Sequence, residues 1–204
     1  MNEDYEDIIK KYRDFLFSKG YVNLSLGQLS RQIGVDGGSV SSYFSTEEEL
    51  VEKVLEYERK QFERIFETHD FEGVNAIDIL LTVSREVALN FPDVSPSITF
   101  ELKNHYPEIY QKHFDFRRDF IYEKIKINLT KGINQGIYRD DLSIELVARL
   151  YLSRLIDLHN PDFFPSEEFS FETIFNTMFE NFIRGIAKPE GLAYFEKRRK
   201  EYKT

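Results

Sequence analysis

Apolar residues recur at helical spacing along almost the whole of this 204-residue chain, whereas the alternation typical of half-buried strands is nearly absent. The segment 4–19 is a first example, because Ile8, Tyr12 and Leu16 fall on one face and Gly20 ends the pattern. Proline and glycine separate the longer segments that follow. These helices are expected near residues 73–91, 95–105, 107–135, 143–159 and 168–187, with a helical tail over 189–203. The pattern predicts an all-α chain of about nine helices.

Shorter helices with their own start signals occupy the region between residues 25 and 50. Ser25 and Gln28 have the spacing of a capping box, in which each side chain satisfies an unpaired backbone N–H. Gly34 breaks the helix that this pair begins. Thr46 and Glu49 show the same spacing and begin a long fourth helix with an acidic first turn, which suits the positive end of the helix dipole.

A third short helix, capped by Asp36, runs through Val40 to Tyr43. Two short helices joined by a tight glycine-containing turn and steadied by a preceding helix form a helix-turn-helix. Three short helices with a glycine turn also occur in proteins that never bind DNA. The periodicity alone therefore leaves DNA binding and plain helical packing equally open.

Composition excludes several classes of protein. The chain has no cysteine, which rules out disulfide scaffolds, thiolate metal sites and cysteine nucleophiles. Its four histidines lack the spacing of a helical metal site, and no phosphate-binding or nucleophile motif is present, so no metal or cofactor is expected. The acidic N-terminus has no apolar core of a signal peptide, and no apolar run is long enough for a membrane span. We expect a soluble, cytoplasmic protein that is not an enzyme.

Particular residues in the N-terminal region stand in the order and spacing of a known DNA-binding head. The residues are Phe17-Ser18-Lys19-Gly20-Tyr21, Ser25, Leu29, Gly34-Val35, Gly38-Ser39-Val40, Tyr43-Phe44 and Glu48-Glu49-Leu50. Together they resemble the head of the tetracycline-repressor (TetR) family of transcription regulators. The later stretch Gly136-Ile137-Tyr138-Arg139-Asp140-Asp141-Leu142 resembles a common lead-in to the penultimate helix of that family.

The resemblance implies a helix-turn-helix DNA-binding domain over residues 1–47 and a helical effector-binding and dimerisation domain over residues 48–204. The expected function is that of a ligand-responsive transcriptional regulator, a repressor, which binds a palindromic DNA operator as a homodimer. Gly38 is expected to let the backbone approach closely, and hydroxyls on the exposed face can bond phosphates or base edges. The candidate DNA-binding residues are Ser25, Gln28, Gly38, Ser39, Ser41, Ser42 and Tyr43.

Aromatic residues recur at helical spacing between Phe100 and Tyr122, beside a few polar side chains. Core packing of long helices explains any single ring, while the group also suits an apolar ligand cavity with polar anchors. The resemblance places an effector cavity among the middle helices, here 73–91, 95–105 and 107–135. The expected ligand is a small organic effector. The candidate lining residues are Phe100, Tyr106, Tyr110, Phe114 and Arg117.

The helices expected over residues 143–159 and 168–187 carry more apolar surface than one protomer is expected to bury. Pairing both helices with their symmetry mates in a four-helix contact would cover that surface, which predicts a homodimer formed mainly there. The apolar residues are Leu146, Leu150, Leu155, Ile174, Phe175, Met178, Phe179 and Phe182.

Departures from the family pattern support a competing hypothesis. Gly37, Ser41 and Glu47 stand where the family usually has a basic or bulky residue, a tyrosine and a phosphate-binding lysine. Residues 1–50 hold five basic side chains against nine acidic ones, and the whole chain carries a net charge of −9. Because Glu47 is expected to place negative charge beside phosphates, the alternative is a TetR-like dimer with weakened DNA binding that acts through a protein partner or a ligand. An all-helical enzyme has no positive support.

Overall fold

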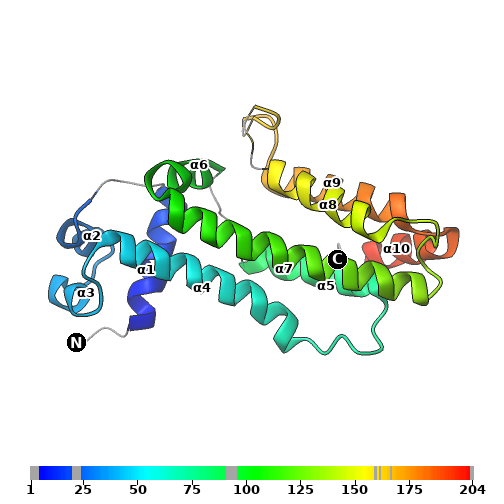
Figure 1. Ribbon diagram of the computed structural model, residues 1–204, viewed down its shortest axis with the longest axis horizontal. Helices are drawn as coiled ribbons and strands as arrows, with labels where there is room; N and C mark the ends of the chain where they lie inside the picture. The colour runs from blue at the N-terminus through cyan, green and yellow to red at the C-terminus, as the bar shows by residue number, and fades with distance from the viewer. Residues whose placement is uncertain are drawn as a thin grey trace. The chain divides into compact units, whose positions relative to one another are not determined.

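The computed structural model describes residues 5–19, 24–90, 96–158, 160, 162–165 and 167–202, without the side chains of residues 90, 96–100, 171 and 202. These residues form ten α-helices and no strand, which confirms the all-α fold class with one helix more than the expected count (Figure 1). Gly20 and Tyr21 of the resembling head, together with His159, lie outside the described residues.

The helices fall into two compact units. The first takes in the described residues up to Glu67 and those of 91–115, and the second takes in those of 68–90 and 116–204. The first unit contains α1 (Tyr5–Lys19), α2 (Leu26–Gln32), α3 (Gly37–Tyr43), nearly all of α4 (Glu47–Thr68), and α6 (Pro96–His105). The second contains α5 (Ala76–Asn90), α8 (Ile144–Asp157), α9 (Phe171–Ile186) and α10 (Pro189–Tyr202). Helix α7 (Pro107–Asn134) contributes its first turns to the first unit and the rest to the second.

The division of the chain into functional domains at residue 47 stays a prediction, and the compact units have different bounds. Most of α4 and the corner between α6 and α7 belong with the N-terminal helices, because their apolar residues share one core. Leu50, Val51 and Leu102 join Ile8 and Leu29 in it. Its other buried members are Ile9, Tyr12, Leu16, Val35, Val40, Phe44, Val54 and Leu55.

Caps hold the short helices where the sequence predicts them. The Ser25–Gln28 capping box is complete, and the backbone N–H of Ser39 donates to Oδ2 of Asp36 over 2.9 Å at the start of α3. At α4 the expected box is altered. Thr46 Oγ1 accepts from the N–H of Glu49, but the Glu49 carboxylate accepts from the N–H of Ser45 instead of Thr46.

The second unit is organised around a buried tyrosine. Tyr138 is fully buried, and its hydroxyl donates to Oδ1 of Asn128 over 3.2 Å, while the Asn128 amide donates to the carbonyl of Ala76 on α5. A Cβ on Gly132 would lie 2.0 Å from the Tyr138 ring, so only glycine lets the ring lie against α7. The stretch 136–142, singled out by its family resemblance, therefore joins α7 to the rest of this unit.

Candidate functional site

Helices α2 and α3 meet through a tight turn in the first unit. Gly34 has a φ of +68°, a left-handed conformation that glycine adopts at little cost, and the N–H of Val35 then donates to the carbonyl of Ser30 over 2.8 Å. Val40 is fully buried, as expected for the core side of α3. This arrangement confirms the helix-turn-helix that the sequence predicts, and Figure 1 shows α2 and α3 as neighbouring short helices.

The two aromatic residues at the end of α3 have different environments. Phe44 is buried and stacks on Tyr5 of α1, with ring centroids 5.5 Å apart. Tyr43 meets the same Tyr5 ring edge to face at 5.5 Å but leaves 42% of its surface exposed. Phe44 therefore anchors α3, and Tyr43 offers a positioned ring at the surface.

The candidate DNA-binding residues on α2 are exposed but bonded to each other. Oε1 of Gln28 accepts from both the backbone N–H and the hydroxyl of Ser25 at 3.0 Å. The amide nitrogen of Gln28 is not used by these bonds. Their role at DNA stays a prediction, and in this structure both side chains hold the start of α2.

The three serines of α3 are not equivalent. Ser41 and Ser42 are exposed, whereas Ser39 is only 8% exposed, so the expectation that Ser39 lies on the open face is wrong. Ser39 is the third residue of α3 and lies beside Val40 on the buried part of the helix. The Ser42 hydroxyl donates to the carbonyl of Ser39 over 2.7 Å.

Gly38 has a structural reason to be glycine that the sequence does not reveal. A Cβ at this position would lie 2.8 Å from Oδ2 of Asp36, the oxygen that caps α3. Any larger residue must push that carboxylate aside. Close approach of the backbone to DNA stays a prediction for Gly38, alongside this local constraint.

Glu47 does not simply project into solvent at the start of α4. Its Oε1 accepts a hydrogen bond from the buried Tyr12 hydroxyl of α1 over 3.0 Å, and Tyr106 at the corner between α6 and α7 also bonds it. Burial raises the pKa of the Glu47 carboxyl, against the lowering effect of both tyrosines and of nearby His105. The position where the resembling family usually has a lysine thus holds a carboxylate that bonds both α1 and the corner between α6 and α7.

A second polar link joins α1 to α4. Arg13 forms a hydrogen-bonded ion pair with Glu58, which is only 7% exposed. Removing one partner of such a buried pair is costly because it leaves a charge without compensation. Sequence reasoning missed both links. Tyr12 and Arg13 on α1 bond Glu47 and Glu58 on α4, and no local sequence pattern connects residues so far apart in the chain.

The candidate ligand residues divide between the two units. Tyr106 and Tyr110 pack against the core of the first unit, and Phe114 stacks on Tyr110 with centroids 6.0 Å apart. Arg117 is exposed and belongs to the second unit, and the side chain of Phe100 lies outside the described residues. Two of the expected cavity residues therefore support the head in this structure, and their contact with a ligand stays a prediction.

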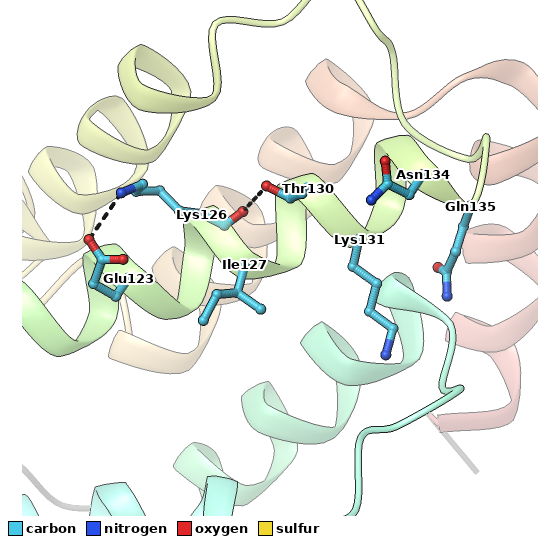
Figure 2. Close-up of a pocket in the computed structure, with 7 residues that line it drawn as sticks. All are labelled: Glu123, Lys126, Ile127, Thr130, Lys131, Asn134 and Gln135. Atoms are coloured by element: carbon cyan, nitrogen blue, oxygen red, sulfur yellow. Dashed lines mark hydrogen bonds and ion pairs between the residues drawn. The ribbon is translucent and has the colours of Figure 1, made fainter.

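A shallow groove of about 570 Å³ lies on α7, away from the residues that the sequence singles out. Figure 2 shows its lining side chains projecting from successive turns of the helix. Most are already engaged: Lys126 pairs with Glu123 at 3.1 Å, and Oε1 of Gln135 accepts from the N–H of Ala76. Ile127 is the exposed apolar member. The complete lining is Glu123, Lys126, Ile127, Thr130, Lys131, Asn134 and Gln135.

The expected dimerisation helices α8 and α9 lie side by side in the second unit, where the rings of Tyr151 and Phe182 are 4.5 Å apart. Leu146 and Leu150 of α8 are 56% and 51% exposed. Three predicted residues of α9 are instead buried within the protomer, because α9 packs its apolar face on its own unit. These are Phe175, Met178 and Phe179.

The described side chains include no group of three or more His, Cys, Asp or Glu residues able to hold a metal ion. Across the described part of the chain, none of the helices combines the length and apolar character that a bilayer span requires.

The sequence is similar to a curated protein, and the fold to solved structures. No protein-family model matches this sequence. The fatty acid metabolism regulator protein of Bacillus subtilis is 21% identical over 185 residues, which cover 89% of this chain and 95% of that protein.

The solved structures carry the comparison further. A TetR transcription regulator from Haloarcula marismortui superposes with a TM-score of 0.71 at 18% identity, covering 90% of this chain and 97% of its own. CprB of Streptomyces coelicolor, solved with its operator sequence, gives 0.70 at 18% identity and covers 98% and 96%. FadR of Bacillus subtilis, solved with stearoyl-CoA, gives 0.66 at 20% identity and covers 90% and 100%. The chain therefore has the fold of the TetR transcription regulators.

Proposed function

We propose that this protein is a ligand-responsive transcriptional regulator, a repressor, that binds a palindromic operator as a homodimer and performs no catalysis. The observation that supports the proposal is the helix-turn-helix of α2 and α3, whose caps, buried Val40 and exposed Ser41–Ser42 face suit a DNA-reading element. The candidate DNA-binding residues remain Ser25, Gln28, Gly38, Ser41, Ser42 and Tyr43. Ser39 is buried and is therefore not among them.

The homodimer would form through α8 and α9. Leu146 and Leu150 are one turn apart on the side of α8 opposite buried Ala148 and Leu152, so an apolar stripe faces outward. A two-fold contact with the same helices of a second protomer would cover the stripe. A dimer also supplies the two heads that a palindromic operator requires.

The effector would be a small organic molecule with an aliphatic or aromatic part, bound among the middle helices. The relative solved with stearoyl-CoA makes a long-chain acyl-CoA the first compound to test. A ligand can regulate DNA binding only by differing in affinity for two states of the protein. The cytoplasm, where operator DNA and acyl-CoA are both present, is the proposed location.

A gel shift with the purified protein and the DNA upstream of its own coding sequence tests the proposal. At low salt we expect one retarded complex, which weakens at moderate salt and is released or strengthened by stearoyl-CoA. A weaker complex in the Arg31→Ala variant provides a control, since Arg31 is exposed and has no acidic partner in the described residues. Failure to bind that DNA at low salt would contradict the proposal.

A second function is favoured by the charge of the head. Residues 1–50 hold more acidic than basic side chains, and Glu47 replaces a phosphate-binding lysine. The alternative protein is a TetR-like dimer that acts through a protein partner or ligand without tight operator binding. Stearoyl-CoA binding measured by calorimetry, combined with no DNA complex at any salt concentration, would support that alternative.

A further inference from the structure

The open face of α3 consists of very small residues. At 100° per residue, Gly38 and Ser42 lie on the side of the helix opposite Val40, which is fully buried, and exposed Ser41 lies beside them, 100° from Val40. Tyr43 lies on a flank, where its ring leans on Tyr5. No side chain on the open face is longer than a serine.

Hydrogen-bond accounting separates the two exposed serines. The Ser42 hydroxyl donates its only proton to the Ser39 carbonyl, so toward DNA it can act only as an acceptor. The Ser41 side chain makes no hydrogen bond to the part of the chain that the structure describes, so its hydroxyl can both donate and accept. Ser41 is therefore the most versatile hydrogen-bonding group on this face.

The long polar side chains of the helix-turn-helix stand on α2 instead. Arg31 is the sole basic residue between positions 24 and 44, and it projects from α2 opposite buried Leu29. The first helix of a helix-turn-helix crosses the DNA backbone, so Arg31 suits a phosphate. Strong base discrimination normally comes from bidentate Arg, Lys, Asn or Gln side chains, and α3 has none.

We infer that this head reads its operator through the single hydroxyl of Ser41 on each α3, and that its sequence discrimination is confined to a few base pairs per half-site. The inference rests on the proposed DNA-binding function and deepens it. Affinity comes from phosphate contacts such as that of Arg31, while Ser41 selects the base. The smooth, glycine-containing face lets the backbone of α3 lie close to the groove floor, which brings a short hydroxyl within reach.

Selection from a pool of random-sequence DNA duplexes with the full-length protein tests this inference. We expect the wild type to enrich a consensus with few specified positions. In Ser41→Ala, the base preference at one of these positions should fall several-fold, with little change in overall affinity. Ser41→Asn should create an adenine preference there, because its amide can bond adenine in a bidentate manner. Ser42→Ala is the matched control. In that variant the base preference at the DNA position read by Ser41 should stay within about twofold of wild type.

Outcomes that contradict the inference differ from those that contradict DNA binding. If Ser41→Ala and Ser41→Asn enrich the wild-type consensus unchanged, Ser41 does not read a base although the protein binds DNA. A consensus that is lost on Ser42→Ala, but not on Ser41→Ala, would overturn the inference in the same way. If the wild-type protein retains no duplex from the pool at low salt, the proposed function itself fails. Thermal melting of each variant establishes that these exposed substitutions leave the fold intact.

Discussion

At the scale of single residues, Glu47 stabilises the fold at a position where the resembling family usually has a phosphate-binding lysine. Its carboxylate is the acceptor for the Tyr12 hydroxyl, whose side chain is only 1% exposed. Glu47→Leu would leave that buried hydroxyl without this acceptor, which costs about 1–3 kcal/mol of unfolding free energy. Urea denaturation of Glu47→Leu and of the exposed control Glu48→Leu measures the difference. Equal stability of the two variants would contradict the structural role of Glu47.

The same carboxylate gives a pH dependence with a definite sign. Burial raises the folded-state pKa of Glu47, so the folded protein binds this proton more tightly than the unfolded chain does. The contribution of Glu47 to the free energy of unfolding is fully present below its pKa in the unfolded chain. It is lost as pH rises through its higher pKa in the folded protein. Glu47→Gln keeps an acceptor for Tyr12 without the charge. Its unfolding free energy relative to wild type should therefore increase between pH 4 and pH 7, and a decrease would refute the burial argument.

At the scale of elements, α3 depends on its cap. Gly38→Ala would place a Cβ 2.8 Å from the capping oxygen of Asp36 and force the carboxylate out of position. We expect a loss of about 0.5–2 kcal/mol, the usual cost of losing an N-cap. Gly27→Ala on α2 is the control with the opposite sign, since a Cβ there meets nothing within 4 Å and alanine favours a helix by about 0.5–1 kcal/mol. Thermal unfolding monitored by circular dichroism compares the two.

The helices themselves could largely be predicted because their signals are local. The capping pair at Ser25 and the Gly34 turn are written in neighbouring residues, and α7 begins and ends within a residue of the expected bounds. Side-chain partners distant in sequence could not be predicted. Examples are the packing of Tyr106 on the N-terminal core and the burial of Ser39. Both arise from contacts between helices, which the periodicity of a single helix does not predict.

At the scale of the whole molecule, the proposed homodimer depends on the exposed apolar stripe of α8, Leu146 and Leu150. Leu150→Glu would bury two charges at the two-fold contact, and we expect a monomer at micromolar concentration because an unpaired buried charge is strongly unfavourable. Leu89→Glu is the control, since Leu89 is an exposed leucine on α5, outside the proposed interface. Light scattering measures the mass of each. Dimers that persist in Leu150→Glu would place the interface elsewhere.

The candidate site was predictable in its location but not in its chemistry. The family-like spacing from Phe17 to Leu50 marks the helix-turn-helix, and the fold comparison bears out that arrangement. The sequence does not reveal that the Ser42 hydroxyl donates to the Ser39 carbonyl or that Glu47 accepts a hydrogen bond from Tyr12. Both depend on how side chains from different turns and helices pack together, and both change the hydrogen-bonding groups that the proposed DNA-binding surface presents.

The salt dependence of DNA binding tests the central claim, that the α2–α3 face contacts DNA, most directly. Fluorescence anisotropy with a labelled duplex from the upstream region gives log affinity against log salt for wild type and Arg31→Ala. We predict a linear fall for wild type, and a slope that is shallower by about two for the variant, because a dimer loses one phosphate contact per protomer at about 0.9 each. Coincident lines, or no binding by the wild type at about 50 mM salt, would contradict the claim.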